Sequence, residues 1–123
     1  MNFKNTKIQG VKLILYKDVT DNRGAFRRHY CFKKIKKNNQ KISKCIQANL
    51  SFNKKKNTLR GFHYQISPYQ EDKILSCLSG KIYDIVLDLR PSSKTYLKHQ
   101  GFYLDHKNKK GLIVPKGCAH AFV

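Results

Sequence analysis

The sequence predicts an all-β fold, a small sandwich or barrel, from three observations. Short segments rich in β-branched and aromatic residues recur along the chain, at residues 45–52, 59–65, 73–78, 81–90, 100–105 and 111–114. Gly, Pro, Asn and Ser residues separate these segments, as turns require, and the Ser79-Gly80 pair suits a hairpin. No stretch of a dozen residues shows the apolar spacing of an amphipathic helix. Short strands at regular intervals are typical of sandwiches and barrels.

The length of 123 residues allows one modest hydrophobic core, so we predict a single domain over residues 1–123. The chain ends on Ala121-Phe122-Val123, an apolar run that is typical of the start of another strand. A strand without its neighbour leaves an open sheet edge. We therefore expect a domain that is incomplete at its C-terminus.

The net charge of +19 comes from 26 basic and 7 acidic residues and favours anionic partners. Many of the basic residues are lysines in runs, at residues 33–37, 54–56 and 107–110. Such runs are usually solvated surface. A basic nucleic-acid-binding barrel, with Tyr and Phe on its strands for base stacking, is a second interpretation that the charge keeps open.

The four cysteines are Cys31, Cys45, Cys77 and Cys118, and their wide spacing forms no CxxC pair. The first thirty residues hold no apolar stretch of the kind that signal peptides need, and the longest apolar runs are far shorter than a membrane span. We predict reduced thiols in a cytoplasmic protein without a membrane role.

Alternation along the predicted strand at residues 81–90 separates two faces. One face is wholly apolar, and the other mixes aliphatic residues with carboxylates: Ile82, Asp84, Val86 and Asp88. We expect the mixed face to meet a polar cavity. In the segment 45–52, three hydrogen-bonding side chains share one face, which either meets solvent or lines a pocket: Gln47, Asn49 and Ser51.

Two histidines lie in segments that carry further signals. A histidine such as His63 on an apolar strand is more often structural, but Pro115-x-Gly117-x-x-His120 is similar to the pattern by which metal-binding cupins bring a histidine into their barrel. Those proteins have His-x-His on the earlier strand, whereas this chain has His63-Tyr64-Gln65. An amide is a poor ligand for a transition metal. We therefore predict a pocket without a metal.

Ordered motifs extend this similarity over most of the chain. They are Asp21-x-Arg23-Gly24-x-Phe26, Gln47-x-Asn49-x-Ser51, Leu59-Arg60-Gly61-x-His63-Tyr64-Gln65, Lys73, Gly80-x-Ile82-x-Asp84-x-x-x-Asp88-Leu89-Arg90 and Pro115-x-Gly117-x-Ala119-His120-x-Phe122. With these blocks at consistent spacing, the chain resembles the dTDP-4-dehydrorhamnose 3,5-epimerases from about Asp18 to Val123.

The resemblance implies a double-stranded β-helix, the jelly-roll or cupin-like barrel, here without its C-terminal part. It also implies a homodimer that needs no metal or redox cofactor. The expected substrate is a 4-keto-6-deoxy sugar attached to dTDP. The expected reaction inverts the carbons on both sides of the ketone, on the route to dTDP-L-rhamnose and surface polysaccharide.

Such a reaction needs a base for a C–H beside the ketone and a cation for the oxygen of the resulting enolate. His63 fits the base, because a neutral imidazole accepts a proton near neutral pH. Lys73 fits the cation at the oxygen. We expect both side chains to line one cavity shielded from water. Asp84 is a candidate for orienting an imidazole, or it accepts a backbone or lysine hydrogen bond.

The family pattern assigns substrate binding to Arg23, Phe26, Gln47, Asn49, Arg60 and His120. Arginine suits a diphosphate because its guanidinium donates two parallel hydrogen bonds. Arg60 and His63 point to opposite sides of a regular strand. We therefore expect Gly61 to distort the strand, or Arg60 to stand at its entrance.

The chain departs from the family pattern at three places. Arg28 stands where a glutamate is usual, and Glu71 where a glutamine is usual. Family members also carry a tyrosine acid and a supporting aspartate beyond the position that matches Val123. At this length we expect enolate formation and hydrogen exchange with solvent, without complete inversion. A catalytically inactive or partly active cupin-like binding protein is the alternative.

Overall fold

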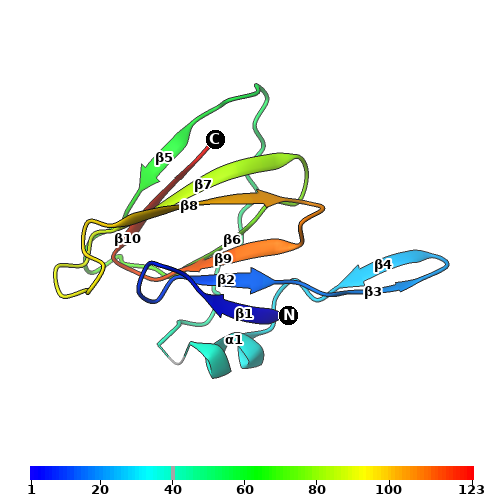
Figure 1. Cartoon of the computed structure of the whole chain (residues 1–123), viewed down its shortest axis with the longest axis horizontal. Helices are drawn as coiled ribbons and strands as arrows, with labels where there is room; N and C mark the ends of the chain where they lie inside the picture. Colours follow the sequence, from blue (N-terminus) through cyan, green and yellow to red (C-terminus); the bar gives the residue numbers. More distant parts are fainter. Residues whose placement is uncertain (40) are drawn as a thin grey trace.

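The computed structural model describes residues 1–39 and 41–123. In this part of the chain, two four-stranded antiparallel sheets face each other as a sandwich, accompanied by a two-stranded hairpin and one short helix (Figure 1). The predicted all-β sandwich or barrel is confirmed.

The first sheet has the order β1-β2-β9-β6 and contains β1 (Asn2–Asn5), β2 (Lys12–Leu15), β9 (Lys110–Val114) and β6 (Lys73–Ser76). The second sheet has the order β5-β10-β7-β8 and contains β5 (Arg60–His63), β10 (Cys118–Phe122), β7 (Lys81–Asp88) and β8 (His99–Asp105). Strands β3 (Asp18–Asp21) and β4 (Gly24–Arg27) form a hairpin of their own. Of the predicted strands, all but residues 45–52 are found; β5, β6 and β7 are shorter than predicted, and β8 and β9 each begin one residue earlier.

Strand β9 is buried on both faces, which makes it the centre of the packing. Leu112 and Val114 point into the core between the sheets, where they join Val86 and Leu104 of the second sheet. Ile113 has the opposite parity and packs on the outer side of the first sheet. Each fully buried aliphatic side chain of this size contributes about 1.5–3 kcal/mol of hydrophobic stabilisation.

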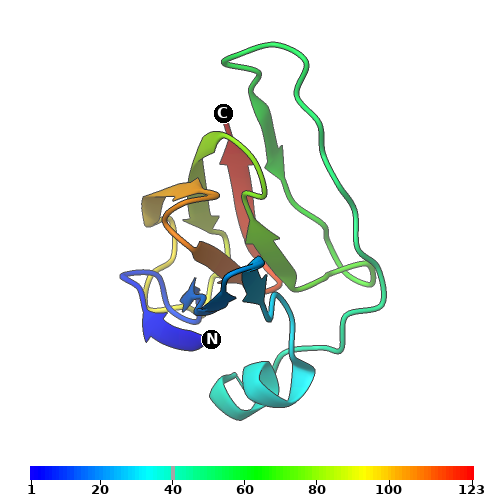
Figure 2. The same cartoon turned by 90° about the vertical axis from the view of Figure 1, so that its right-hand side faces the viewer.

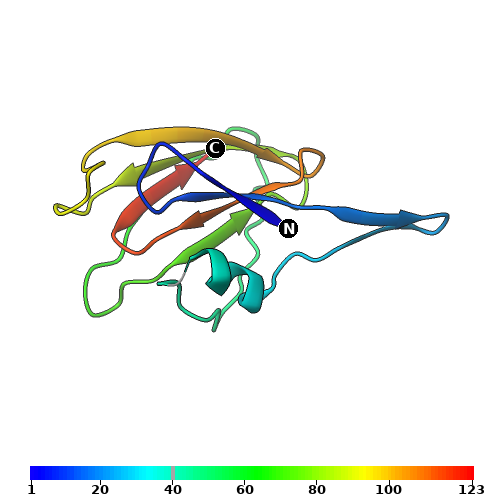
Figure 3. The same cartoon turned by 60° about the horizontal axis from the view of Figure 1, so that its bottom comes forward.

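The helix α1 (Phe32–Asn38) covers the outer side of the first sheet, as Figure 3 shows from below. Its one buried residue is Ile35, which packs against Ile14, Tyr16 and Ile113. A single apolar anchor among four lysines gives no helical stripe, so the sequence does not predict this helix. Two lysines in the last turn complement the negative end of the helix dipole.

The predicted strand at residues 45–52 is wrong. This segment belongs to a long extended connection between α1 and β5 that runs beside the sandwich (Figure 2). Its apolar residues Ile46, Leu50 and Phe52 are exposed. The alternation is that of a strand, but the described residues place no partner strand beside it, and backbone pairing is what turns an extended segment into sheet.

The Ser79-Gly80 turn does not close a hairpin, contrary to the prediction. It connects β6 in the first sheet to β7 in the second, so the chain crosses the core at this point. Gly80 has φ +72°, a left-handed conformation that glycine adopts without steric cost. A turn signal marks a change of direction, but it leaves open which strand follows in space.

The β3–β4 hairpin extends away from the sandwich as an arm (Figures 1 and 3). At its base, Arg27 Nε lies 2.6 Å from Asp18 Oδ1, and Lys109 Nζ lies 3.1 Å from Asp18 Oδ2. The ring of Tyr16 stacks on His29 with 4.8 Å between centroids. These contacts fix the direction in which the arm leaves the body.

The cysteines behave as the sequence predicts, since Cys31, Cys45, Cys77 and Cys118 are all free thiols. Burial raises the pKa of the Cys118 thiol to about 12, which keeps it protonated and unreactive. Among the described residues, none of the helices is long and apolar enough to cross a bilayer.

Asp88 at the end of β7 is fully buried and collects hydrogen bonds from the loop that follows. Arg90 Nε donates at 2.8 Å, and the hydroxyls of Ser93 and Thr95 each donate at 2.6 Å. Burial raises the pKa of Asp88, but the bonds from Arg90, Ser93 and Thr95 outweigh it and leave the pKa well below its ordinary range. Arg90 in turn donates to the Gln9 carbonyl, so the network joins the N-terminal loop to the second sheet.

We expect Asp88→Asn to destabilise the fold by about 3 kcal/mol at pH 7, because it leaves Arg90 without its buried partner. A depressed folded-state pKa contributes stability above the unfolded pKa of about 4 and loses it as the pH falls. The penalty should therefore shrink below about pH 4. Urea unfolding at several pH values measures it, with Asp21→Asn on the exposed arm as the control. An equal penalty at every pH would contradict the role of the ionised carboxylate.

Candidate active site

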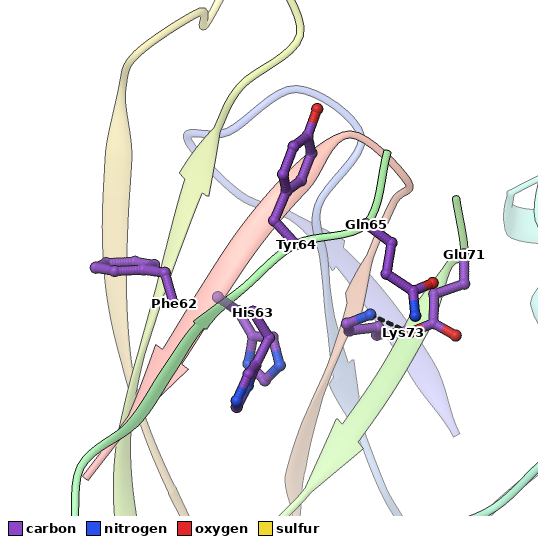
Figure 4. Close-up of a pocket in the computed structure, with 7 residues that line it drawn as sticks. Phe62, His63, Tyr64, Gln65, Glu71 and Lys73 are labelled. Carbon is purple, nitrogen blue, oxygen red and sulfur yellow. Dashed lines mark hydrogen bonds and ion pairs between the residues drawn. The ribbon is translucent and has the colours of Figure 1, made fainter. Parts of the chain in front are cut away.

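A pocket of about 430 Å³ opens where the two sheets face each other (Figure 4). The second sheet contributes His63 from β5 and His120 from β10, and the first sheet contributes Lys73 from β6. The remaining lining residues are Phe62, Tyr64, Gln65 and Glu71. The predicted base and the predicted cation therefore lie in one cavity.

The pairing of β5 with β10 places the two histidines together. His63 and His120 are direct partners across the strands, and their ring centroids lie 5.6 Å apart. Farther along, Arg60 is the partner of Phe122, so three residue steps on β5 match two on β10. This bulge lies at Gly61, which has φ +118°. The distortion that the parity of Arg60 and His63 predicted is confirmed.

Asp84 forms a hydrogen bond with the imidazole of His120. It lies on β7 beside β10, it is fully buried, and its Oδ2 is 3.1 Å from His120 Nδ1. When the carboxylate is ionised, the Nδ1–H donates to it and Nε2 keeps its lone pair. Burial raises the pKa of Asp84, and the contact with His120 opposes that shift. The predicted contact with an imidazole is present, and the imidazole is that of His120.

Lys73 forms an ion pair with Glu71 on the other wall of the pocket (Figure 4). The intervening Asp72 points away and accepts hydrogen bonds from the backbone N–H of Ser43 at 2.9 Å and of Lys116 at 3.0 Å. Asp72 thus joins two loops to the start of β6. It fixes the backbone on which Glu71 and Lys73 stand.

The cavity is less shielded from water than the sequence predicted. His120 is 4% exposed, but His63 lies on the edge strand β5 and is exposed. The imidazole pair therefore has one buried member, anchored on a carboxylate, and one member that faces the open side.

The predicted substrate-binding residues other than His120 lie outside the pocket lining. Arg60 Nε donates to Asn53 Oδ1 at 2.7 Å, which ties β5 to the extended connection. Gln47 and Asn49 share a face, as predicted, but they contact each other at 3.1 Å on the surface. Arg23 and Phe26 lie on the arm, where Arg23 pairs with Asp21 at 2.7 Å.

Sequence reasoning missed the pairing of Glu71 with Lys73, although it identified Glu71 as a departure from the family pattern. The signal that could have indicated this pair is their separation by two positions, which puts Glu71 and Lys73 on the same side of an extended segment. Gln65 also lines the pocket and shares its parity with His63. Among the described residues, no three His, Cys, Asp or Glu side chains gather as a metal site.

This arrangement suits the removal of a proton from a carbon acid. An imidazole on one wall can take the proton, while an ammonium on the other wall can donate hydrogen bonds to an oxygen that gains charge. The two groups come from different sheets and line the same pocket.

Comparison with known proteins identifies the family. The family model of dTDP-4-dehydrorhamnose 3,5-epimerase matches residues 5–123. The chain belongs to this family. It is 35% identical over 122 residues to the dTDP-4-dehydrorhamnose 3,5-epimerase of Shigella flexneri, an alignment that covers 99% of this chain and 67% of that protein.

Solved structures of dTDP-4-dehydrorhamnose 3,5-epimerase relatives have the same fold. The dTDP-6-deoxy-D-glucose-3,5-epimerase of Legionella pneumophila Philadelphia 1, solved with dTDP-4-keto-L-rhamnose, superposes with a TM-score of 0.90 at 35% identity, over 98% of this chain and 63% of that one. The enzyme of Bacillus anthracis, solved with TDP and pyrophosphate, gives 0.89 at 33% identity, over 98% and 69%. The cupin-like jelly roll is thereby confirmed. The chain spans about two thirds of the length of these relatives.

We expect Gly61→Ala to disrupt the epimerase-family site by displacing β5. A Cβ at this position would lie 2.7 Å from the backbone of Ala121, and φ +118° is unfavourable for any residue with a side chain. Thermal unfolding should show a loss of roughly 2–4 kcal/mol, and the NMR signals of the His63 and His120 rings should shift.

Gly80→Ala is the matched control for this substitution. Gly80 also has positive φ, but a Cβ there would meet no atom within 4 Å. It should cost about 1 kcal/mol and leave both histidine signals in place. Equal effects of the two substitutions would show that close packing of β5 on β10 is not what positions His63.

Proposed function

We propose that this protein is a sugar-nucleotide epimerase of the dTDP-4-dehydrorhamnose 3,5-epimerase type. The observation that carries the proposal is the presence of His63 and Lys73 in one pocket, on opposite walls. The substrate is a 4-keto-6-deoxy sugar carried on dTDP, in the pathway to dTDP-L-rhamnose and surface polysaccharide. Membership of the family and the ligands of its solved members support this substrate class.

The chemistry begins with His63 taking a proton from a carbon next to the ketone. The electrons of the C–H bond form the C=C bond of an enolate, and the carbonyl oxygen takes the negative charge. Lys73 donates a hydrogen bond to that oxygen as the charge develops, which is where a fixed cation lowers the barrier most. Return of a proton to the carbon regenerates the ketone, and return to the opposite face inverts the centre.

His120 binds the substrate in this proposal, and Asp84 is the residue that positions it. The Nδ1 contact with Asp84 keeps the ring orientation fixed and leaves Nε2 for the pocket. The four free cysteines are consistent with a cytoplasmic site of action, as expected for an enzyme that uses a soluble nucleotide sugar. The residues named need no metal or redox cofactor for this reaction.

The active form is a homodimer in which the arm of one copy reaches the pocket of the other. The Arg23 side chain is 86% exposed and Phe26 is 72% exposed. Both lie on an arm that extends away from the sandwich. Phe26 is the cross-strand partner of Val19, so the arm carries an exposed apolar pair. A second copy supplies the surface that covers this pair and the pocket that needs the arginine.

Incubation with dTDP-4-keto-6-deoxyglucose in deuterated water should introduce deuterium beside the ketone, detected by NMR and mass spectrometry. His63→Ala should slow the exchange by about 10²–10⁴-fold, and Lys73→Ala by about 10²–10³-fold. His106→Ala and Lys81→Ala, which lie outside the pocket, are the matched controls. Exchange supports the proposed removal of the proton, and inversion of the carbon supports epimerisation as well. Absence of exchange contradicts the proposal.

Mixing two inactive variants tests the exchange of arms. Heterodimers of Arg23→Ala and His63→Ala copies should have one complete site, because the arginine and the histidine come from different copies. Random mixing should restore about a quarter of the wild-type activity. A mixture of His63→Ala and Lys73→Ala is the control, since both residues belong to the pocket of one copy. Recovery in the control mixture, or none in the test mixture, would contradict the shared site.

A further inference from the structure

We propose that Glu71 is a specificity residue that excludes free anions from the pocket. It is the only glutamate in the chain. Its carboxylate pairs with the Lys73 ammonium on the wall opposite His63, as Figure 4 shows. Among the described residues that line the pocket, it is also the only carboxylate.

The backbone holds this pair at the mouth of the pocket. Asp72 is fixed between two loops by its bonds from Ser43 and Lys116, so Glu71 and Lys73 project together on the other side. The Lys73 side chain is 17% exposed and that of Glu71 is 52% exposed. The carboxylate therefore lies nearer to solvent, and a ligand that enters the pocket meets it before the ammonium.

The net positive charge of the protein is the reason why a carboxylate in the pocket affects anion binding. With 26 basic and 7 acidic residues, the molecule attracts anions over its whole surface. An unpaired lysine in an open pocket beside two imidazoles is a ready phosphate site, since ammonium groups are common phosphate ligands. Glu71 cancels that charge at the position where an inorganic anion would bind.

The pair still leaves Lys73 able to serve a neutral oxygen. An ammonium has three N–H donors, and one of them suffices for Glu71. The others can donate to a ketone, which carries no charge for the carboxylate to repel. The pocket thus accepts a neutral acceptor and rejects an anion at the same place. This preference for a ketone rests on the proposed function, whereas the exclusion of anions does not.

Titration calorimetry with inorganic phosphate, at constant ionic strength, tests the proposal. Glu71→Gln keeps the shape and removes the charge, and it should tighten phosphate binding by about fivefold, the upper range for an exposed charge pair. The gain should disappear in the double variant Glu71→Gln, Lys73→Ala. Asp105→Asn, at the end of β8, changes the net charge equally outside the pocket and should produce no such gain.

Unchanged phosphate binding by Glu71→Gln would overturn the proposal, as would a gain that survives loss of Lys73. Because the titration needs no turnover, its outcome is independent of the epimerase assay. A protein that binds phosphate as described but exchanges no deuterium would retain the exclusion of anions and lose the proposed reaction. In an active protein, phosphate should inhibit Glu71→Gln at about fivefold lower concentration than wild type.

Discussion

The site depends on the pairing of β5 with β10. This register puts His63 against His120, and the next strand, β7, places Asp84 under His120. Strand β10 is hydrogen-bonded on both sides, to β5 and to β7, so the interior of the second sheet determines where β5 lies. Lys73 comes from the first sheet, so its distance from the histidines is set by the packed core around Leu112 and Val114. The geometry of the candidate site follows from strand register and core packing together.

The few carboxylates of this basic chain are placed where each compensates a defined group. Asp88 closes the Arg90 network, Asp18 anchors the arm, and Asp72 accepts two backbone donors beside the pocket. Asp84 and Glu71 stand on the two sides of the pocket, one buried and one exposed. Many of the lysines, in contrast, lie in runs at residues 33–37, 54–56 and 107–110. Acidic positions in such a sequence are therefore more informative about structure than basic ones.

The sequence predicted the fold class and most strands, because alternation and turn residues are local signals, and its motifs predicted that His63 and Lys73 line one pocket. It predicted the distortion at Gly61 because Arg60 and His63 conflict in parity within one strand. It failed for residues 45–52 and for the turn at Ser79-Gly80. Both failures have one cause, since which strand lies beside another is decided by the whole fold. The sequence did not predict helix α1, because Ile35 is its one buried residue and a single apolar residue gives no helical pattern.

The candidate site shows the same division between local and global information. The motifs assigned Arg23, Phe26 and Arg60 to the same ligand as His63. In the fold, however, Arg23 and Phe26 lie on the arm, and Arg60 lies on the edge strand β5, hydrogen-bonded to Asn53 of the extended connection. The hairpin that carries Arg23 and Phe26 extends away from the sandwich, and neither residue lines the pocket. The proposed homodimer accounts for this separation, because the exposed apolar pair on the arm gives a second copy a surface to cover.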